Sequence, residues 1–297
     1  MNTMVETIIQ VIVPITMFTL MFGMGLTLTA ADFKRVLVFP KPTFIGLVLQ
    51  LLALPAIGLA LAYSFELSAM IAVGLVAVAA CPGGTTSNVV VHMGKGDTAL
   101  SITLTATATA VTLFTLPLWV NYTLGIFGGA ETTVEMPIIK TAAQLALFTV
   151  FPVGLGMFAR SRKPSLVERE PIISKVSTVA MITAFIGAGI ADSGNTLANA
   201  GVVVIPSALL VLAALVLGYG VPRLSGISKK DSATIAVETC LKNILLSLFL
   251  ATNALKELDA AYASAVVGMI MMPVAVGIMV AYNISNKRAA QAGGEVV

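Results

Sequence analysis

Residues 77–97 read AVAACPGGTTSNVVVHMGKGD and interrupt an otherwise apolar segment with a proline, two glycines and a polar cluster. Pro82 has no amide hydrogen, and each glycine costs about 1 kcal/mol in a helix interior, so a helix is expected to break here. A simple proline kink explains this pattern equally well. The polar cluster favours a second half-helix that begins near mid-membrane, with its free amides and positive dipole end facing a cavity. That cluster consists of Thr85, Thr86, Ser87 and Asn88.

The composition around this stretch is that of an all-α polytopic membrane protein. Of the 297 residues, 58% are hydrophobic and 10% are charged, and the mean hydropathy is +0.99. A soluble domain carries about 25% charged residues. The basic residues lie in short links, so no nucleic-acid surface is expected. Cys81 and Cys240 lie in apolar segments and form neither a disulfide framework nor a metal-binding spacing.

Nine segments are long enough to cross a lipid bilayer as helices of about 20 residues. They are 8–28, 43–63, 69–93, 98–121, 138–158, 173–191, 198–220, 231–254 and 261–282. The first is expected to be a retained span rather than a signal peptide, since no positive charge precedes it. All links are short, which predicts a single transmembrane transporter domain over residues 1–297. Its first half, about 1–125, holds spans 1–4 and its second, about 135–285, holds spans 5–9.

The basic residues predict the orientation. With the N-terminus outside, 14 of the 17 Lys and Arg lie in cytoplasmic links or in the C-terminal tail. The exceptions are Lys140, Lys242 and Lys256. This asymmetry follows the positive-inside rule. It predicts a multi-pass protein of the cell inner (plasma) membrane with a cytoplasmic C-terminus.

The eighth span, which includes DSATIAVETCLKNILLSLFLA at 231–251, contains two charges beyond its first residue, Asp231. Glu238 and Lys242 are four residues apart, so a continuous helix would place them on one face. Lys242 would lie about 16 Å from Asp231, near the bilayer centre. Intramembrane charges are expensive and mark function by default, although a structural ion pair is the alternative.

A hydroxyl stripe runs along the fourth span, where Ser101, Thr105 and Thr109 recur every four residues. Such stripes often serve only helix packing. Interruptions at corresponding positions of two halves, however, indicate a transporter site. Spans 3 and 8 run in opposite directions, so the positive ends of their second halves would converge on one cavity. That arrangement suits an anion, and the nearby oxygens suit Na⁺.

The chain resembles the bile acid:sodium symporter family over nearly its whole length. The matching stretches are MFGMGLTL at 21–28, LQLLALP at 49–55, CPGGTTSNVV at 81–90, ALSITLT at 99–105 and VETCLKN at 237–243. The resemblance implies inverted repeats with panel and core parts, and two broken helices that cross, spans 3 and 8. It implies the nine-span form of the family.

The same resemblance implies two sodium sites and a substrate site. The first sodium site is expected to use Ser87, Asn88, Ser101, Thr105 and Glu238. The second is expected to use Gln50, Glu238, Thr239 and Leu241, with Lys242 at a position that is usually glutamine and therefore in place of the second Na⁺. The substrate is expected at Gly84, Thr85, Thr86 and Asn243. It would be a small organic anion, either a carboxylate such as pantoate or pyruvate or a bile-acid-like molecule. Some bacterial members carry a His-Asn pair in the last span, where this chain has MIMMPVAV at 269–276.

Three other functions remain open at this stage. One is a related metalloid or anion efflux permease with Cys81 as a soft ligand. Another is a proton-coupled anion transporter. An intramembrane enzyme has little support, because the chain has no His-rich motif or paired aspartates and its one histidine, His92, lies near a span end. We expect a transporter rather than an enzyme, and a monomer.

Overall fold

The computed structural model describes residues 11–38, 40–128, 137–191 and 196–294, and within these ranges the chain is helical with no strand. In chain order the α-helices are α2 (Val13–Thr27), α3 (Ala30–Lys34), α4 (Pro40–Val48), α5 (Leu54–Ser64), α6 (Ala69–Ala80), α7 (Thr85–Met93), α8 (Thr98–Phe127), α9 (Ile138–Leu145), α10 (Phe151–Arg162), α11 (Glu170–Ala191), α12 (Thr196–Leu224), α13 (Lys229–Cys240), α14 (Ile244–Phe249) and α15 (Leu258–Gly294). The 3₁₀ turns are η2 (Arg35–Leu37) and η5 (Pro164–Arg169), and the π-helical segments are η3 (Leu49–Ala53), η4 (Ala146–Val150) and η6 (Leu250–Leu255).

Several of these helices are long and apolar enough to cross a membrane. The six that qualify alone are Pro40–Ser64, Thr98–Phe127, Ile139–Arg162, Gly201–Leu224, Lys229–Leu255 and Leu258–Ser285. Two bent pairs raise the count to eight: α2 with Ala30–Leu37, bent by 74°, and α6 with α7, bent by 52°. In the described part of the chain, each of the nine segments predicted from hydropathy is helical apart from residue 28 and the breaks at 81–84 and 241–243. The chain is therefore a multi-pass membrane protein with six to eight spans by length and composition.

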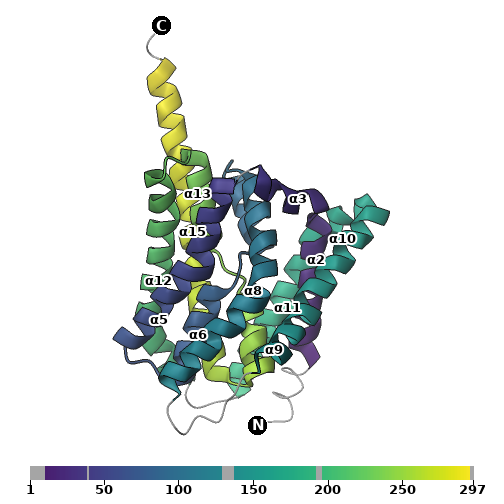
Figure 1. The fold of residues 1–297 in the computed structure, drawn as a ribbon, viewed down its shortest axis with the longest axis vertical. Helices are drawn as coiled ribbons and strands as arrows, with labels where there is room; N and C mark the ends of the chain where they lie inside the picture. Colours follow the sequence, from purple (N-terminus) through teal and green to yellow (C-terminus); the bar gives the residue numbers. More distant parts are fainter. Residues whose placement is uncertain (1–10, 39, 129–136, 192–195, 295–297) are drawn as a thin grey trace.

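The helices form two groups in space. Figure 1 shows α2, α10 and α11 together on one side, and α5, α6, α8, α12, α13 and α15 on the other. Helix α2 packs against both α10 and α11, whereas α6 packs against α5, α8 and α15. Where Gly25 of α2 faces α10, a Cβ would overlap the backbone of Val153, and one at Gly74 of α6 would overlap that of Ala260. Glycines at these contacts let the helix backbones approach each other closely.

The π-helical turn before Pro55 leaves two backbone carbonyls that accept hydrogen bonds from side chains of other spans. Proline cannot donate a hydrogen bond, so the carbonyls that residue 55 would bond in α- or π-helical register need other partners. These carbonyls belong to Leu51 and Gln50. Trp119 Nε1 donates to Leu51 O at 2.9 Å, and Lys242 Nζ donates to Gln50 O at 3.3 Å. This local irregularity therefore links the second span to α8 and to the break in the eighth.

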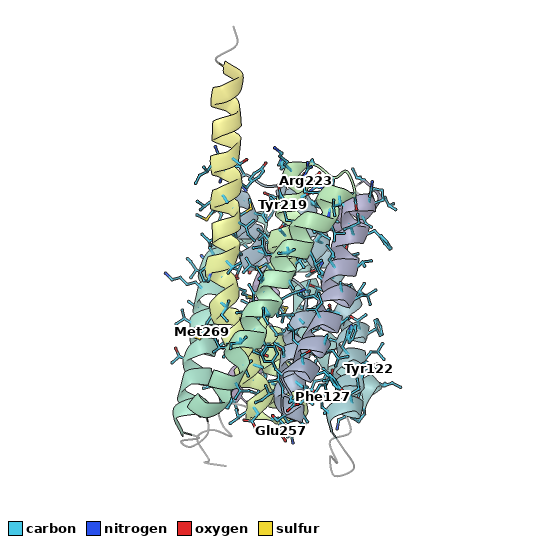
Figure 2. All side chains as sticks on the ribbon, turned by 90° about the vertical axis from the view of Figure 1, so that its left-hand side faces the viewer. Tyr122, Phe127, Tyr219, Arg223, Glu257 and Met269 are labelled. Atoms are coloured by element: carbon cyan, nitrogen blue, oxygen red, sulfur yellow. The ribbon has the colours of Figure 1, made fainter. Side chains whose placement is uncertain are left out.

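Three arginines lie toward the same end of the molecule. Figure 2 shows Arg223 and Tyr219 near the end from which α15 extends, with Glu257 and Phe127 at the opposite end. Helix α10 carries Arg160 and Arg162 in its last turn, and this turn lies toward the same end as Arg223 (Figures 1 and 2). These three arginines thus lie toward one end of the helices, which we call the basic end.

Candidate functional site

The first break in the fold lies between α6 and α7, where residues 81–84 leave helical geometry. Gly84 occupies the N-cap position of α7 in an extended conformation and no side chain caps the helix there. Ser87 N donates to Gly84 O at 3.1 Å, so it is the amides of Thr85 and Thr86, at the positive end of the helix dipole, that remain available to a ligand. The expected break at Pro82 is confirmed.

The second break lies between α13 and α14, in a stretch with no proline or glycine. Helix α13 ends at Cys240 because Leu241 is extended, with φ −84° and ψ 103°. Asn243 then caps α14, and its Oδ1 accepts a hydrogen bond from Leu246 N at 3.1 Å. The expectation that Glu238 and Lys242 share one helix face is wrong, because Lys242 lies beyond the end of the helix that carries Glu238.

The two breaks touch each other. Asn243 N donates to Pro82 O at 2.8 Å, in place of the bond that it would make to Thr239 O in a continuous helix. A Cβ on Gly84 would lie 4.0 Å from Asn243 Cβ. The first turns of α7 and α14 therefore begin beside the same crossing point.

Next to this crossing, a buried cluster of oxygens surrounds Glu238. Ser101 Oγ donates to Glu238 Oε1 at 2.5 Å, and Thr105 Oγ1 donates to Oε2 at 2.8 Å. Asn88 Oδ1 lies 2.7 Å from Ser101 Oγ and 3.5 Å from Thr105 Oγ1. Ser87 is fully buried, and its hydroxyl donates to Gly84 O at 2.7 Å. All five residues expected at the first sodium site thus lie together.

Acceptors outnumber donors in this cluster. The hydroxyls of Ser101 and Thr105 have one hydrogen each but face both the carboxylate of Glu238 and the amide oxygen of Asn88. A Cβ at Gly83 would collide with Glu238 Oε2, so this position must remain glycine for the carboxylate to sit where it does. One carboxylate among neutral hard oxygens is a donor set that suits a small hard cation.

The hydroxyl stripe of α8 divides between two roles. Ser101 and Thr105 reach the cluster, whereas Thr109 Oγ1 donates to Thr105 O in its own helix at 2.7 Å. The stripe therefore does not act as one unit, because only Ser101 and Thr105 reach the cluster.

Within the expected second sodium site, Lys242 and Gln50 lie in contact, but they pair differently from the expectation. Lys242 donates to the main-chain oxygen of Gln50, and it makes no ion pair with Glu238 within 4 Å. The side-chain amide of Gln50 and the hydroxyl of Thr239 are buried and have no hydrogen-bond partner in the described part of the chain. Leu241, next to Lys242, is buried in the break. The ammonium group is thus held between the second and eighth spans, with unpaired polar atoms nearby in the same two elements.

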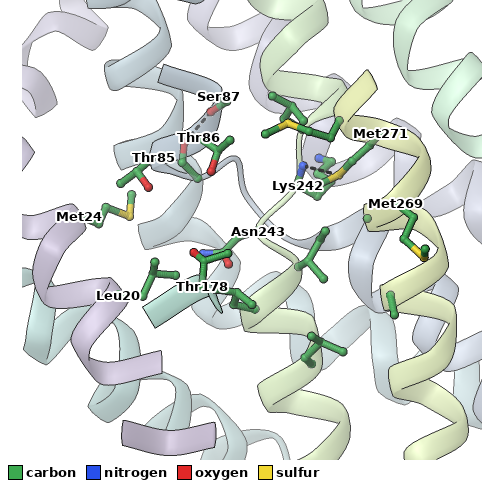
Figure 3. A pocket seen from close by; sticks show the side chains of 18 of the residues that line it. Leu20, Met24, Thr85, Thr86, Ser87, Thr178, Lys242, Asn243, Met269 and Met271 are labelled. Atoms are coloured by element: carbon green, nitrogen blue, oxygen red, sulfur yellow. Dashed lines mark hydrogen bonds between the residues drawn. The ribbon is translucent and has the colours of Figure 1, made fainter. Parts of the chain in front are cut away.

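A cavity of 510 Å³ opens at the crossing (Figure 3). It is lined by Leu20, Met21, Met24, Gly84, Thr85, Thr86, Ser87, Thr178, Leu241, Lys242, Asn243, Ile244, Leu245, Leu248, Ala265, Gly268, Met269, Met271 and Met272. All four residues expected to bind substrate are among them. The polar groups come mainly from the two breaks, and the walls are apolar with five methionines. A ligand with one anionic end and an apolar body matches this division.

Sequence reasoning missed Thr178, which reaches the cavity from α11. It lies in an unbroken apolar span, so no local signal identifies it. The methionines were detectable, since MIMMPVAV stands out as an apolar replacement for a polar pair. Cys81 is fully buried and does not line the cavity, and His92 is exposed, with its Nδ1 3.4 Å from Thr98 Oγ1. No group of three or more His, Cys, Asp or Glu that would hold a metal occurs among the described residues.

Comparisons with known proteins agree on one group of transporters. A family model described as the Sodium Bile acid symporter family matches residues 14–200. A probable sodium/metabolite cotransporter of rice chloroplasts, BASS2 (Oryza sativa subsp. japonica), is 32% identical over 249 residues, which cover 82% of this chain and 58% of that protein. The uncharacterized sodium-dependent transporter YocS of Bacillus subtilis is 32% identical over 253 residues, covering 81% and 74%. The human ileal sodium/bile acid cotransporter is 26% identical over 251 residues, covering 82% and 70%. The chain thus spans less than two thirds of the length of the rice protein.

Proposed function

Because this chain belongs to the Sodium Bile acid symporter family, we propose that it is a secondary active transporter that imports an organic anion together with Na⁺ by alternating access. One observation carries the proposal. The buried cluster around Glu238 adjoins a crossing at which two helix N-termini face an open cavity. A cation and an anion bound there would be close enough to stabilise each other.

We assign Na⁺ to the cluster of Ser87, Asn88, Ser101, Thr105 and Glu238. The support is the donor set, since a single carboxylate with hydroxyl and amide oxygens suits a monovalent hard ion. The chain's relatives are sodium cotransporters by name.

We further propose that the Lys242 ammonium takes the place of a second Na⁺, so that one Na⁺ moves in each cycle. Its hydrogen bond to Gln50 O holds a fixed positive charge between the same elements that would provide the second site. A Na⁺ about 4 Å away would be repelled by about 4 kcal/mol at an effective dielectric constant near 20. One fixed cation therefore disfavours a second mobile one.

The substrate, on this proposal, places its carboxylate at Gly84, Thr85, Thr86 and Asn243 and its body against the methionines. Backbone amides at helix N-termini bind anions without a full positive charge. The apolar walls favour a carboxylate with an extended apolar body. Among the expected substrates, a bile-acid-like molecule fits this description better than pyruvate does. Methionine walls adapt to ligands of irregular shape.

For the membrane arrangement we propose nine spans, with α11 as the span beyond the eight that length and hydropathy identify. Helices α2, α10 and α11 would form the panel and the others the core, with the two halves of the chain as inverted repeats. The site is built within one chain, which supports a monomeric transporter. The basic end of the helices would face the cytoplasm in the cell inner membrane.

This orientation predicts that a reporter active only outside the inner membrane stays silent when it is fused after residue 288. The same reporter placed within the 129–136 link should be active, because that link follows the opposite end of α8. An active C-terminal fusion would contradict the proposed orientation.

The function itself is tested by uptake into proteoliposomes. The purified chain is supplied with labelled carboxylates that range from pyruvate to bile acids, under an inward Na⁺ gradient or an equal K⁺ gradient. We expect Na⁺-dependent accumulation of at least one carboxylate with an apolar body. Accumulation that is equal under both gradients would contradict sodium coupling.

Changing Asn243 to Asp is expected to raise the apparent KM for the anion at least tenfold while Na⁺ binding persists. Aspartate caps a helix as well as asparagine does, so α14 keeps its start, but its negative charge opposes the substrate carboxylate. Asn243→Ser is the matched control, because serine also caps the helix and adds no charge. Initial uptake rates against substrate concentration measure the effect, and an unchanged KM in the Asp variant would place the carboxylate elsewhere.

A further inference from the structure

A second cavity, distinct from the crossing, lies between α12, α13 and α15 and has a volume of 460 Å³. Its lining consists of Leu215, Tyr219, Lys229, Ala233, Val274, Gly277, Ile278, Ala281, Tyr282 and Ser285. None of these residues lines the cavity at the crossing. Helices α12 and α15 lie side by side along it (Figure 2). We call it the α12–α15 groove.

The groove changes from apolar to polar along its length. On α15 the apolar Val274 and Ile278 precede Tyr282 and Ser285, and on α12 Leu215 precedes Tyr219 by one turn. Both helices run toward the basic end of the molecule as they make this change (Figure 2). A lipid has the same gradient, with acyl chains toward the membrane centre and a polar headgroup at the interface, where tyrosines are enriched.

Small residues keep the groove open. A Cβ at Gly277 would meet no atom within 4 Å, and Ala233 and Ala281 add little volume. The apolar walls around them pack against the core of the protein. The hollow is therefore part of the packed helix surface rather than a gap between loose side chains.

The rim of the groove is positively charged. Lys229 lines it from the first turn of α13, and it makes no ion pair within 4 Å in the described part of the chain. Lys230 follows it, and Asp231 is the acidic residue of that turn, so the turn keeps a net positive charge. An exposed, unpaired lysine at the polar end of an apolar groove is complementary to an anionic headgroup.

We propose that the α12–α15 groove binds an anionic phospholipid, with an acyl chain against Val274 and Ile278 and the headgroup phosphate at Lys229. The tyrosines would lie at the level of the glycerol backbone. A bound lipid would span three helices of the core and leave the crossing free, because the two cavities share no residue. This proposal does not depend on which substrate is transported.

Native mass spectrometry of the full chain tests the proposal. Purified protein is offered equal amounts of phosphatidylglycerol and phosphatidylethanolamine with identical acyl chains, and the lipid adducts are counted. We expect phosphatidylglycerol to be retained about fivefold more than phosphatidylethanolamine, the preference that one lysine near the headgroup supplies. Glycerol 3-phosphate, which has the phosphate but no acyl chain, is expected not to compete.

Two variants with matched controls locate the site. Gly277→Leu should abolish retention of both lipids by filling the groove, whereas Gly154→Leu, at an equally open position of α10, should not. Lys229→Gln should remove the preference but keep some retention of both lipids, and Lys41→Gln should change neither. Equal retention of the two lipids by the unmodified chain, competition by glycerol 3-phosphate, or full retention by Gly277→Leu would overturn the proposal.

Discussion

Replacing Glu238 with glutamine is expected to reduce Na⁺-driven uptake at least a hundredfold. The carboxylate is fully buried and supplies the only negative charge of the cluster, with hydroxyls of Ser101 and Thr105 held against its two oxygens. Glutamine has nearly the same shape but no charge, and one of its two terminal atoms donates hydrogen bonds instead of accepting them. The ion would thus lose both its counter-charge and one oxygen ligand. Thr105→Val removes one neutral ligand and should cost much less.

Sodium-dependent thermal stabilisation measures this effect independently of transport. A ligand that binds only the folded state raises Tm with its concentration, so Na⁺ should stabilise the unmodified chain and K⁺ should not. Because Glu238→Gln leaves the Lys242 cation buried without a compensating negative charge, the double variant with Lys242→Met, which removes that cation and adds no good Na⁺ ligand, controls for misfolding. Sodium stabilisation that survives in a folded Glu238→Gln variant would exclude Glu238 from the ion site.

Replacing Lys242 with glutamine is expected to convert a transporter of one Na⁺ into a transporter of two. The ammonium now occupies the position beside Gln50, whose side-chain amide is buried and unpaired. Glutamine removes the fixed charge and supplies an oxygen, so a second Na⁺ can bind there. The Hill coefficient for Na⁺ should rise from near one toward two.

The same variant should change the electrical behaviour of transport. Transport of one Na⁺ with one monocarboxylate moves no net charge. Transport of two Na⁺ with one monocarboxylate moves one positive charge inward. At 100 mV, inside negative, one charge contributes about 2.3 kcal/mol, so the potential alone should raise the accumulation ratio of the variant about fiftyfold. The unmodified chain should not respond to a potassium diffusion potential.

Lys242→Met separates the loss of charge from the gain of a ligand. Methionine is neutral and similar in length, but its sulfur is a poor ligand for Na⁺. This variant should therefore keep a Hill coefficient near one. An unmodified chain with a coefficient near two, or with potential-dependent accumulation, would show that the lysine does not replace the ion.

The sequence alone was sufficient for the helical, membrane-spanning character of the chain and for the first break, because both have local causes. Apolar runs must cross a membrane as helices whose backbone groups pair internally, and Pro82 with its two glycines cannot continue such a helix. The sequence also identified an intramembrane carboxylate and a hydroxyl stripe at helical spacing, but the contact between them joins residues 137 and 133 positions apart and needed the tertiary structure. Ser101, Thr105 and Thr109 could be identified as one stripe on α8 from their spacing. Only the structure showed that Thr109 does not reach the cluster.

Tertiary contacts decided the second break and the environment of Lys242. No proline or glycine interrupts residues 241–243, so local rules alone would give a continuous helix with Glu238 and Lys242 on one face; the break expected in the eighth span followed from its correspondence with the third and from the family resemblance. In the folded chain Asn243 N bonds to Pro82 O, a carbonyl that is available only because the first break exists. Lys242 lies outside the helix and donates a hydrogen bond to Gln50 O. This carbonyl lacks a backbone donor because residue 55 is proline. Each of these partners is remote in sequence, and the exchange of a helical hydrogen bond for one across the crossing appears only when both broken helices are brought together.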